Sequence, residues 1–398
     1  MLPIEIKPGI LWVGVNDRIT ELFEGLWTIK EEGVSYNSYL IQDEKTAVID
    51  LCKAMLSGEY FDQLQSLVPL EKLDYVIINH MEPDHTGALR RLIKNAPGVT
   101  LLGTAKTRDM LAEFYGITEN FRVVTDGETI NLGKHTLRFV ITPFLHWPET
   151  MMTYEESQKI LFSCDAFGSY GVLNGNIFDD AFMPVAWYEE QALRYYSNIV
   201  SIFPKPVRNA IAKLANVPID VIAPSHGLVW RNHPERIVDL YQKWSGYATE
   251  PADLGVTLLF GSIYGNTEEA MEAVAQGVVD AGVPLNVFNV TKTPVSYILP
   301  SLLTQCGVLV GAPTYEGGLF PQMVHVMEMA EAKHIFDRKT AYFGSHGWIG
   351  GGEREFIRLA GELKWEVLGA FNFTGSPSRD ELIQAREFGK VFAQKLKS

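Results

Sequence analysis

Four apolar, strand-like runs in the first part of the sequence each lead, at their carboxyl end, into residues that can bind a metal ion. The runs are LDYVIIN, TLRFVITPFL, KILFSC and DVIAPS, and the residues that follow them are His80, Glu82, Asp84 and His85, then His146, then Asp165, then His226. Loops at one rim of a sheet converge, so side chains at strand ends gather there. These four imidazoles and three carboxylates are enough for two ions that share one carboxylate. The sequence therefore predicts a domain built on sheets, with a metal site at one rim.

The segment HMEPDH supports this prediction most strongly, because it places four ligand-type side chains directly after an apolar strand. We expect an extended turn in which the first His, the Glu and the Asp point one way, while His85 reaches a neighbouring ion. The residues that follow, TGALRRLIK, are expected to begin a helix that fixes the turn. A single His or Asp at a strand end is more often a cap, so the prediction depends on the whole group. His135 and His233 lie in turn-like polar contexts and are expected on the surface.

The charge and the cysteine content exclude several other classes of protein. The chain has 398 residues, with 34 basic and 48 acidic side chains and a net charge of −14. This field repels phosphate backbones and anionic lipids, so neither nucleic acid nor a membrane is expected as a partner. Three separated cysteines make no disulfide framework and no CxxC pair. No basic leader and no run of about 18 apolar residues is present, so we expect a cytoplasmic protein.

The chain changes its pattern near residues 245–254, where SGYATEPADLG mixes Gly, Ser, Pro and acidic residues in the manner of a linker. We therefore expect one domain at 1–250 and a second at 254–398. The first part has strand-like runs such as YNSYLIQD, TAVIDL and VTLLGT with a few helical patterns, which predicts an α+β or layered α/β arrangement. The second part alternates strand and helix regularly, which predicts an open, doubly wound parallel sheet.

The loop from Ser262 to Thr267 follows the apolar run VTLLFG and precedes a helical pattern. Unpaired N–H groups at a helix N-terminus make such a loop a phosphate site, and an ordinary helix cap is the alternative. Two later loops, at 312–318 and 345–352, are expected beside it at the switch point of the sheet. The absence of GxGxxG, and a loop too short for a dinucleotide, favour FMN over FAD or NAD. The residues expected to bind FMN are Ser262, Ile263, Tyr264, Gly265, Asn266, Thr267, Ala312, Pro313, Thr314, Tyr315, Glu316, Gly317, Ser345, His346, Gly347, Trp348, Gly350 and Gly351.

These motifs resemble those of the flavodiiron proteins. The pattern HxExDH with the later His, Asp and His, and the stretches YNSYL, HWPETM and APSHGLVW, are similar to that family's metallo-β-lactamase-like domain. The second part is similar to the family's flavodoxin-like domain, so the resemblance covers essentially the whole chain. It implies α/β and α+β classes, as a metallo-β-lactamase-like αββα sandwich followed by a flavodoxin-like doubly wound parallel sheet. It also implies a di-iron centre with His80, Glu82 and His146 on one iron, Asp84, His85 and His226 on the other, and Asp165 bridging them.

The resemblance further implies an oxidoreductase that reduces dioxygen to water, nitric oxide to nitrous oxide, or both, with FMN passing electrons to the irons. It implies a head-to-tail homodimer in which each FMN lies beside the irons of the partner. Because the sequence ends at Ser398 without a CxxC-bearing module, a separate electron donor is expected, either rubredoxin or a reduced deazaflavin.

Two alternatives remain open at this point. Zinc hydrolases of the same fold typically carry HxHxDH, whereas this chain has Glu82 in place of the third imidazole. A hard oxygen donor suits iron, which must change its oxidation state, and zinc has no redox chemistry. A dinuclear zinc hydrolase with a flavodoxin domain is nevertheless one alternative, and an electron carrier in which only the FMN domain works is the other. The sequence does not distinguish dioxygen from nitric oxide as the preferred substrate.

Overall fold

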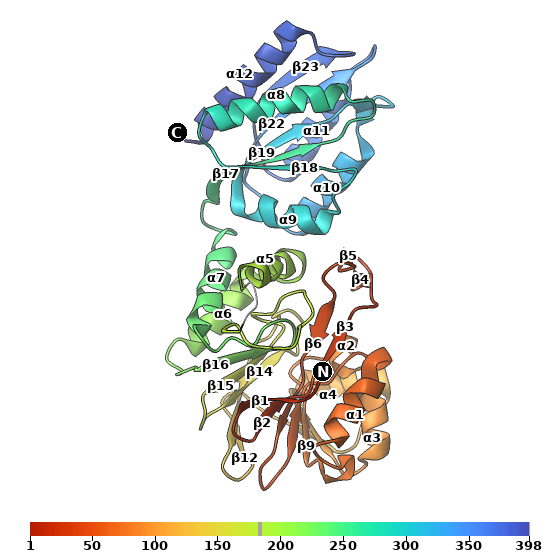
Figure 1. The fold of residues 1–398 in the computed structure, drawn as a ribbon, viewed down its shortest axis with the longest axis vertical. Helices are drawn as coiled ribbons and strands as arrows, with labels where there is room; N and C mark the ends of the chain where they lie inside the picture. The colour runs from red at the N-terminus through yellow and green to blue at the C-terminus, as the bar shows by residue number, and fades with distance from the viewer. Residues whose placement is uncertain (182–184, 398) are drawn as a thin grey trace. The chain divides into compact units, whose positions relative to one another are not determined.

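The computed structural model describes residues 1–181 and 185–397, which separate into two compact units, Met1–Ser245 and Gly246–Ser398 (Figure 1). Helix α7 (Pro234–Gly246) extends into the segment expected to be a linker, and strand β17 (Asp253–Phe260) begins before the end of that segment. The irregular connection is therefore shorter than the sequence indicated. Among the described residues, no helix is both long enough and apolar enough to cross a bilayer.

The first unit contains two mixed sheets. In strand order, the first sheet consists of β1 (Ile4–Lys7), β2 (Ile10–Trp12), β7 (Tyr39–Ile41), β8 (Ala47–Ile49), β9 (Tyr75–Ile77), β10 (Thr100–Gly103) and β11 (Phe121–Val123). The second consists of β12 (Thr129–Asn131), β13 (Thr136–Ile141), β14 (Met151–Glu155), β15 (Ile160–Cys164) and β16 (Val221–Pro224). Two short pairs join β3 (Val15–Asp17) to β6 (Val34–Tyr36) and β4 (Leu22–Phe23) to β5 (Trp27–Thr28). Every residue of β7, β8, β15 and β16 is buried, which is why these strands are nearly continuous apolar runs.

Helices cover the outer face of each sheet. Figure 1 shows α1, α3 and α4 beside the first sheet, and α6 and α7 beside the second. The helices of this unit are α1 (Ser57–Gln65), α2 (Pro83–Thr86), α3 (Leu89–Asn95), α4 (Ala105–Tyr115), α5 (Val185–Tyr195), α6 (Pro204–Leu214) and α7, with 3-10 turns at Ala54–Leu56 and Leu70–Lys72 and a π-helical turn at Tyr196–Val200. Local sequence fixes several ends: Thr104 and Thr107 form a capping box before α4, and Gly116 ends that helix in the left-handed conformation, at φ 70°.

The two sheets are joined face to face through buried contacts. The Tyr39 hydroxyl of the first sheet donates a hydrogen bond to the Pro224 carbonyl of the second (2.6 Å). The Tyr39 ring lies 5.0 Å from that of Phe162, measured between centroids. The Thr153 hydroxyl donates to the side-chain oxygen of Asn79 (2.8 Å), the residue just before His80. These contacts fix the carboxyl end of β9 against the second sheet.

The second unit is an open parallel sheet in the order β18 (Leu285–Asn289), β17, β19 (Gln305–Gly311), β22 (Lys339–His346) and β23 (Glu366–Thr374), and each neighbouring pair is parallel. Its helices are α8 (Asn266–Asp280), α9 (Val295–Thr304), α10 (Pro321–Ala332), α11 (Gly352–Glu362) and α12 (Arg379–Leu396), and a short hairpin joins β20 (Thr314–Tyr315) to β21 (Gly318–Leu319). Numbered along this unit, the strand order is 2-1-3-4-5, so β18 is added on one side of β17 and the later strands on the other, which puts the topological switch point between β17 and β19. The doubly wound sheet is the one that the strand–helix alternation predicted.

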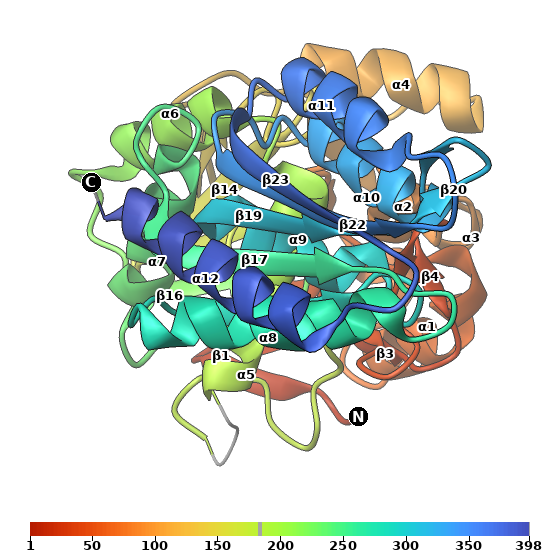
Figure 2. The same cartoon turned by 90° about the horizontal axis from the view of Figure 1, so that it is seen from above.

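Helices α8 and α12 lie side by side on one face of this sheet, and α9, α10 and α11 cover the other (Figure 2). Two glycines allow the close approach of α8 and α12. A Cβ atom on Gly277 would lie 1.9 Å from the Arg386 carbonyl oxygen, and one on Gly389 would lie 2.1 Å from the Val274 carbonyl oxygen. The last helix of the chain is therefore packed backbone to backbone against the first helix of its unit.

Candidate metal and flavin sites

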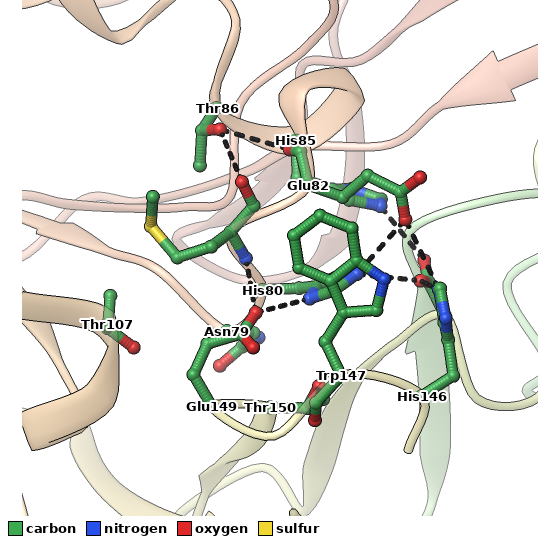
Figure 3. A network of polar contacts seen from close by, with 12 residues as sticks. Asn79, His80, Glu82, His85, Thr86, Thr107, His146, Trp147, Glu149 and Thr150 are labelled. Carbon is green, nitrogen blue, oxygen red and sulfur yellow. Dashed lines mark hydrogen bonds and ion pairs between the residues drawn. The ribbon is translucent and has the colours of Figure 1, made fainter. Parts of the chain in front are cut away.

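The seven side chains expected to bind metal lie together at the carboxyl ends of β9, β13, β15 and β16. They form two neighbouring groups, and within each group the possible ligand atoms lie within 4.8 Å of one another. The first group is His80, Glu82, His146 and Asp165, and the second is Asp84, His85 and His226. Figure 3 shows three members of the first group, with Glu82 and His146 turned toward the imidazole of His80. The sequence separates these residues by up to 146 positions, and the two sheets bring them to one rim.

Asp165 lies between the two groups and presents one oxygen to each. Its Oδ2 lies 3.1 Å from His146 Nε2 and 3.5 Å from His80 Nε2. Its Oδ1 lies 3.0 Å from His85 Nε2 and 3.3 Å from His226 Nε2. A carboxylate in this position is arranged to serve two cations at once.

The loop between β9 and α2 positions four of the seven side chains. Asn79 donates its backbone N–H to Asp50 Oδ1 (2.8 Å), which fixes the chain just before His80. The expected extended turn continues only to Glu82, because Pro83 begins α2 and places Asp84 and His85 within a short helix. Proline suits the first helical position, since its φ is already helical and its missing N–H needs no partner there. The Thr86 hydroxyl bonds back to the Glu82 carbonyl at 3.0 Å, which closes the turn (Figure 3).

Two of the imidazoles are oriented from behind by buried acceptors. His80 Nδ1 lies 2.7 Å from Glu149 Oε1, and His226 Nδ1 lies 2.7 Å from the Ser35 carbonyl oxygen. Because these oxygens accept a hydrogen bond from Nδ1–H, the Nε2 atom of each ring is left to face the site. Sequence reasoning missed Glu149, although it stands three residues after His146 in HWPET.

The charges of the site are strongly coupled. Burial lowers the pKa of each imidazole, but the neighbouring carboxylates outweigh it and raise the pKa of His146 to about 9 and that of His226 to about 10. Burial would raise the pKa of Asp165, but the imidazoles around it, His85 first, hold that pKa well below its ordinary value. Without a metal ion, Asp165 is therefore ionised, and His146 and His226 hold protons that a cation would displace.

The second unit has a cavity of about 600 Å³ at the carboxyl ends of β17, β19 and β22. Fourteen of the eighteen residues expected to bind FMN line it: Ser262, Ile263, Tyr264, Asn266, Thr267, Pro313, Thr314, Tyr315, Glu316, Gly317, Ser345, His346, Gly347 and Trp348. Gly265, Ala312, Gly350 and Gly351 do not line it, and Ile349 and Gly375 do so in addition. Gly350 and Gly351 line an adjoining hollow beside Arg354.

The amino end of α8 opens onto this cavity. Gly265 precedes the helix at φ 96°, a left-handed conformation that favours glycine, and its N–H bonds to Ser262 Oγ (3.0 Å). The Thr267 and Ser345 hydroxyls lie 3.0 Å apart across the floor of the cavity. Hydroxyls and free helix N–H groups at one point are a site for an anion such as a phosphate.

Each of the two units matches a known protein family. Residues 34–227 match the family described as ODP family beta lactamase, and residues 258–389 match Flavodoxin. The chain is 35% identical over 399 residues to the anaerobic nitric oxide reductase flavorubredoxin of Salmonella paratyphi B, covering 99% of this chain and 82% of that one. The chain belongs to the flavodiiron protein family.

Solved flavodiiron proteins share the whole fold. The flavodiiron protein from Giardia intestinalis has a TM-score of 0.94 and 27% identity, covering 100% of this chain and 97% of that one. The rubredoxin oxygen:oxidoreductase from Desulfovibrio gigas has a TM-score of 0.92 and 27% identity, covering 99% and 98%. The predicted family and the predicted fold class, a metallo-β-lactamase-like sandwich followed by a flavodoxin-like sheet, are confirmed.

Several atoms in the metal site of this flavodiiron protein make no well-aligned hydrogen bond among the described residues, although some of them lie within ion-pair distance of one another. They are both oxygens of Asp84, both ring nitrogens of His85, Nε2 of His226 and Oδ1 of Asp165. A buried polar or charged atom without a partner is costly, and a cation between these atoms would satisfy them together. Imidazole and carboxylate donors also match the ligands that iron takes in proteins. The residues therefore fit a metal ion, and the flavodoxin unit implies a flavin in its cavity.

The structure corrects one prediction for the other histidines of this unit. His135 was expected on the surface but is buried, with its Nδ1 3.0 Å from Glu155 Oε1. Its position in a tight connection between β12 and β13 looked exposed in sequence, yet that connection packs against the turn after β14. His233 is exposed, as expected.

Proposed function

We propose that this flavodiiron protein is an oxidoreductase that reduces dioxygen to water, nitric oxide to nitrous oxide, or both, at two iron ions, with FMN as the electron carrier. The observation that supports it best is the position of Asp165, whose two oxygens face two separate groups of ligand atoms. Its relatives carry names that fit this reaction, since one is a nitric oxide reductase and another an oxygen oxidoreductase.

The ligand assignment follows the two groups. His80, Glu82 and His146 would hold one iron, Asp84, His85 and His226 the other, and Asp165 both. When bound, the irons would supply electrons and Lewis acidity to the gas, and FMN would return electrons to them. Glu82 supports iron over zinc because it offers a hard oxygen where a zinc hydrolase has an imidazole.

Aromatic rings form walls around these ligands. The rings of Phe23, Tyr36 and Tyr195 lie 5.6 to 5.7 Å from that of His226, and the ring of Trp147 lies 5.1 Å from that of His80. Such walls restrict the entry of bulk water, and they suit small apolar gases better than charged substrates. This argues against a hydrolase for polar esters.

FMN is the proposed flavin because the cavity has an anion-binding corner at Thr267 and the start of α8, and the sequence has no dinucleotide fingerprint. The rim carries large exposed apolar side chains: Tyr264, Trp348 and Ile349 are 91, 90 and 72% exposed. Exposed apolar side chains of this size mark contact surfaces. They support the proposal of a head-to-tail homodimer in which this rim meets the partner's metal unit.

The electron donor is proposed to be rubredoxin, because the relative from Desulfovibrio gigas is named for that donor, with a reduced deazaflavin as the alternative. The three cysteines are free, which supports a reducing compartment such as the cytoplasm.

The test is anaerobic stopped-flow of the chemically reduced protein against dioxygen and against nitric oxide, with iron, zinc and flavin measured on the same sample. Two irons, one FMN and rapid reoxidation by either gas support the proposal. Two zinc ions with no reoxidation would favour the hydrolase. A mass measurement during dilution tests the dimer, because monomers should lose turnover while they keep iron and flavin.

A further inference from the structure

The carboxylate of Glu149 is not one of the proposed ligands, yet it is built into the metal site. It is 1% exposed, and its Oε1 accepts hydrogen bonds from His80 Nδ1 (2.7 Å) and from the Met81 backbone N–H (2.8 Å). Figure 3 shows it directly behind the His80 ring. Its Oε2 is buried and has no partner among the described residues.

The backbone around Glu149 is fixed to the same loop. The Thr104 hydroxyl donates to the Glu149 carbonyl (3.2 Å), and the Met151 N–H donates to the Asn79 carbonyl (3.0 Å). Because the fixed Glu149 carboxylate accepts a hydrogen bond from His80 Nδ1, the ring proton of His80 stays on Nδ1. The Nε2 atom then faces Glu82 Oε2 at 3.2 Å and Asp165 Oδ2 at 3.5 Å.

The second ligand group has no carboxylate in the equivalent place. His226 Nδ1 is bonded to a neutral acceptor, the Ser35 carbonyl oxygen. His85 Nδ1 has no hydrogen-bond partner among the described residues. A carboxylate behind an imidazole makes that ligand more basic than a carbonyl does. The two groups therefore differ in donor strength even though Asp165 is common to both.

We propose that Glu149 is a positioning residue that makes the two halves of the centre unequal, so that the half with His80, Glu82 and His146 takes up a divalent ion first. This inference rests on the proposed function, because it assumes that both groups hold a metal. Partners behind the ligands are worth about 10- to 100-fold in metal affinity. The preference for the first half should therefore be of that size.

The experiment is a titration of the metal-free, full-length protein with Co²⁺, followed by the visible absorption of the ion. The unaltered protein should take up two ions in two resolved steps. Glu149→Gln keeps the size of the side chain but removes its charge. It should weaken the first step by about 10- to 100-fold and leave the second unchanged.

Glu155→Gln is the matched control, because Glu155 is also buried and also accepts from a histidine, with His135 Nδ1 at 3.0 Å. That pair lies outside both ligand groups, so both steps should stay as they are. Equal loss in the two variants would mean a general effect on folding and would overturn the assignment to Glu149. A purely structural role for Glu149 would likewise weaken both steps together.

A second measurement needs no variant, in case Glu149→Gln does not fold. In proton NMR of the unaltered protein, the first equivalent of Co²⁺ should shift the imidazole N–H that shows cross-relaxation with the Met81 N–H, since both bond to the same oxygen. A first equivalent that shifts the His226 N–H, or both alike, would overturn the inference while leaving the two-metal proposal intact. Failure to bind a second Co²⁺ at any concentration would overturn the proposed function itself.

Discussion

Replacing Gly351 by alanine tests whether the contact between two loops of the second unit controls flavin binding. Gly351 touches the loop that carries Gly317: a Cβ atom on Gly351 would lie 2.0 Å from the Gly317 carbonyl oxygen and 2.6 Å from its carbon. The N–H groups of Gly351 and Gly352 bond to Thr314 Oγ1, at 3.2 and 3.1 Å, so this contact joins two walls of the cavity. Gly351 has a φ of −177°, outside the left-handed region that favours glycine, so the expected effect is argued from the steric contact alone.

The size of the expected effect follows from the 2.0 Å between a Cβ on Gly351 and the Gly317 carbonyl oxygen. Real Cβ atoms stay at least about 3.0 Å from such an oxygen, so the loops must separate by about 1 Å. Overpacking of this kind costs about 1 to 3 kcal/mol. If the separated loops no longer match the flavin, the affinity for FMN should fall by roughly 5- to 150-fold.

The assay is the quenching of FMN fluorescence when FMN is added to flavin-free protein, with iron measured in parallel. Iron should be unchanged, because its proposed ligands all lie in the first unit. Gly361→Ala, in helix α11, which Gly351 directly precedes, is the control: a Cβ there meets no atom within 4 Å, and FMN affinity should be unaltered. An FMN affinity of Gly351→Ala equal to that of the unaltered protein would show that the two loops yield freely, and the reasoning would be wrong.

Three further outcomes are expected. Asp165→Ala should lose metal from both groups, because one carboxylate serves both, and two irons counted per chain in the purified variant would contradict that role. Thr267→Val should weaken FMN binding about 5-fold, since the hydroxyl paired with Ser345 at 3.0 Å is lost, and a calorimetric affinity within error of the parent would move the phosphate site elsewhere. Between pH 8 and pH 6, metal affinity should fall as pH falls, by about 10-fold per pH unit for each proton displaced, because His146 and His226 have pKa values raised to about 9 and about 10 in the metal-free site. Calorimetry in two buffers of different ionisation heat counts those protons, and an affinity independent of pH would contradict the argument.

The strand-end pattern made much of the metal site predictable. Strands buried on both faces read as apolar runs, so β9, β15 and β16 stood out, and a proposed metal ligand follows each of them within a few residues. Strand β14 was missed although every residue of it is buried, because MMTYE has neither a β-branched run nor a strict alternation. In the second unit, the segment that forms α9 gives no clear helical pattern in the sequence, because Pro300 lies inside it.

Glu149 shows what a sequence pattern does not reveal. It binds His80 from 69 positions away, and only the packing of β14 against the loop after β9 brings the two together. A glutamate between a tryptophan-proline pair and a threonine gives no local sign of such a contact. The start of α2 at Pro83 was equally hard to predict, because a proline after a strand is compatible with an extended turn as well as with the first position of a helix.

The glycine-mediated contact of α8 and α12 sets an order on how this chain can mature. Every loop of the flavin cavity lies between residues 262 and 375, yet α12, the helix that completes their scaffold, follows all of them in the sequence. Arg386 and Lys397 of that closing segment bond to Asp280 and to the Ala281 carbonyl at the far end of α8. The metal-binding unit can thus fold on the ribosome while the rest of the chain is still being made, whereas the flavin cavity can be completed only after α12 has been synthesised.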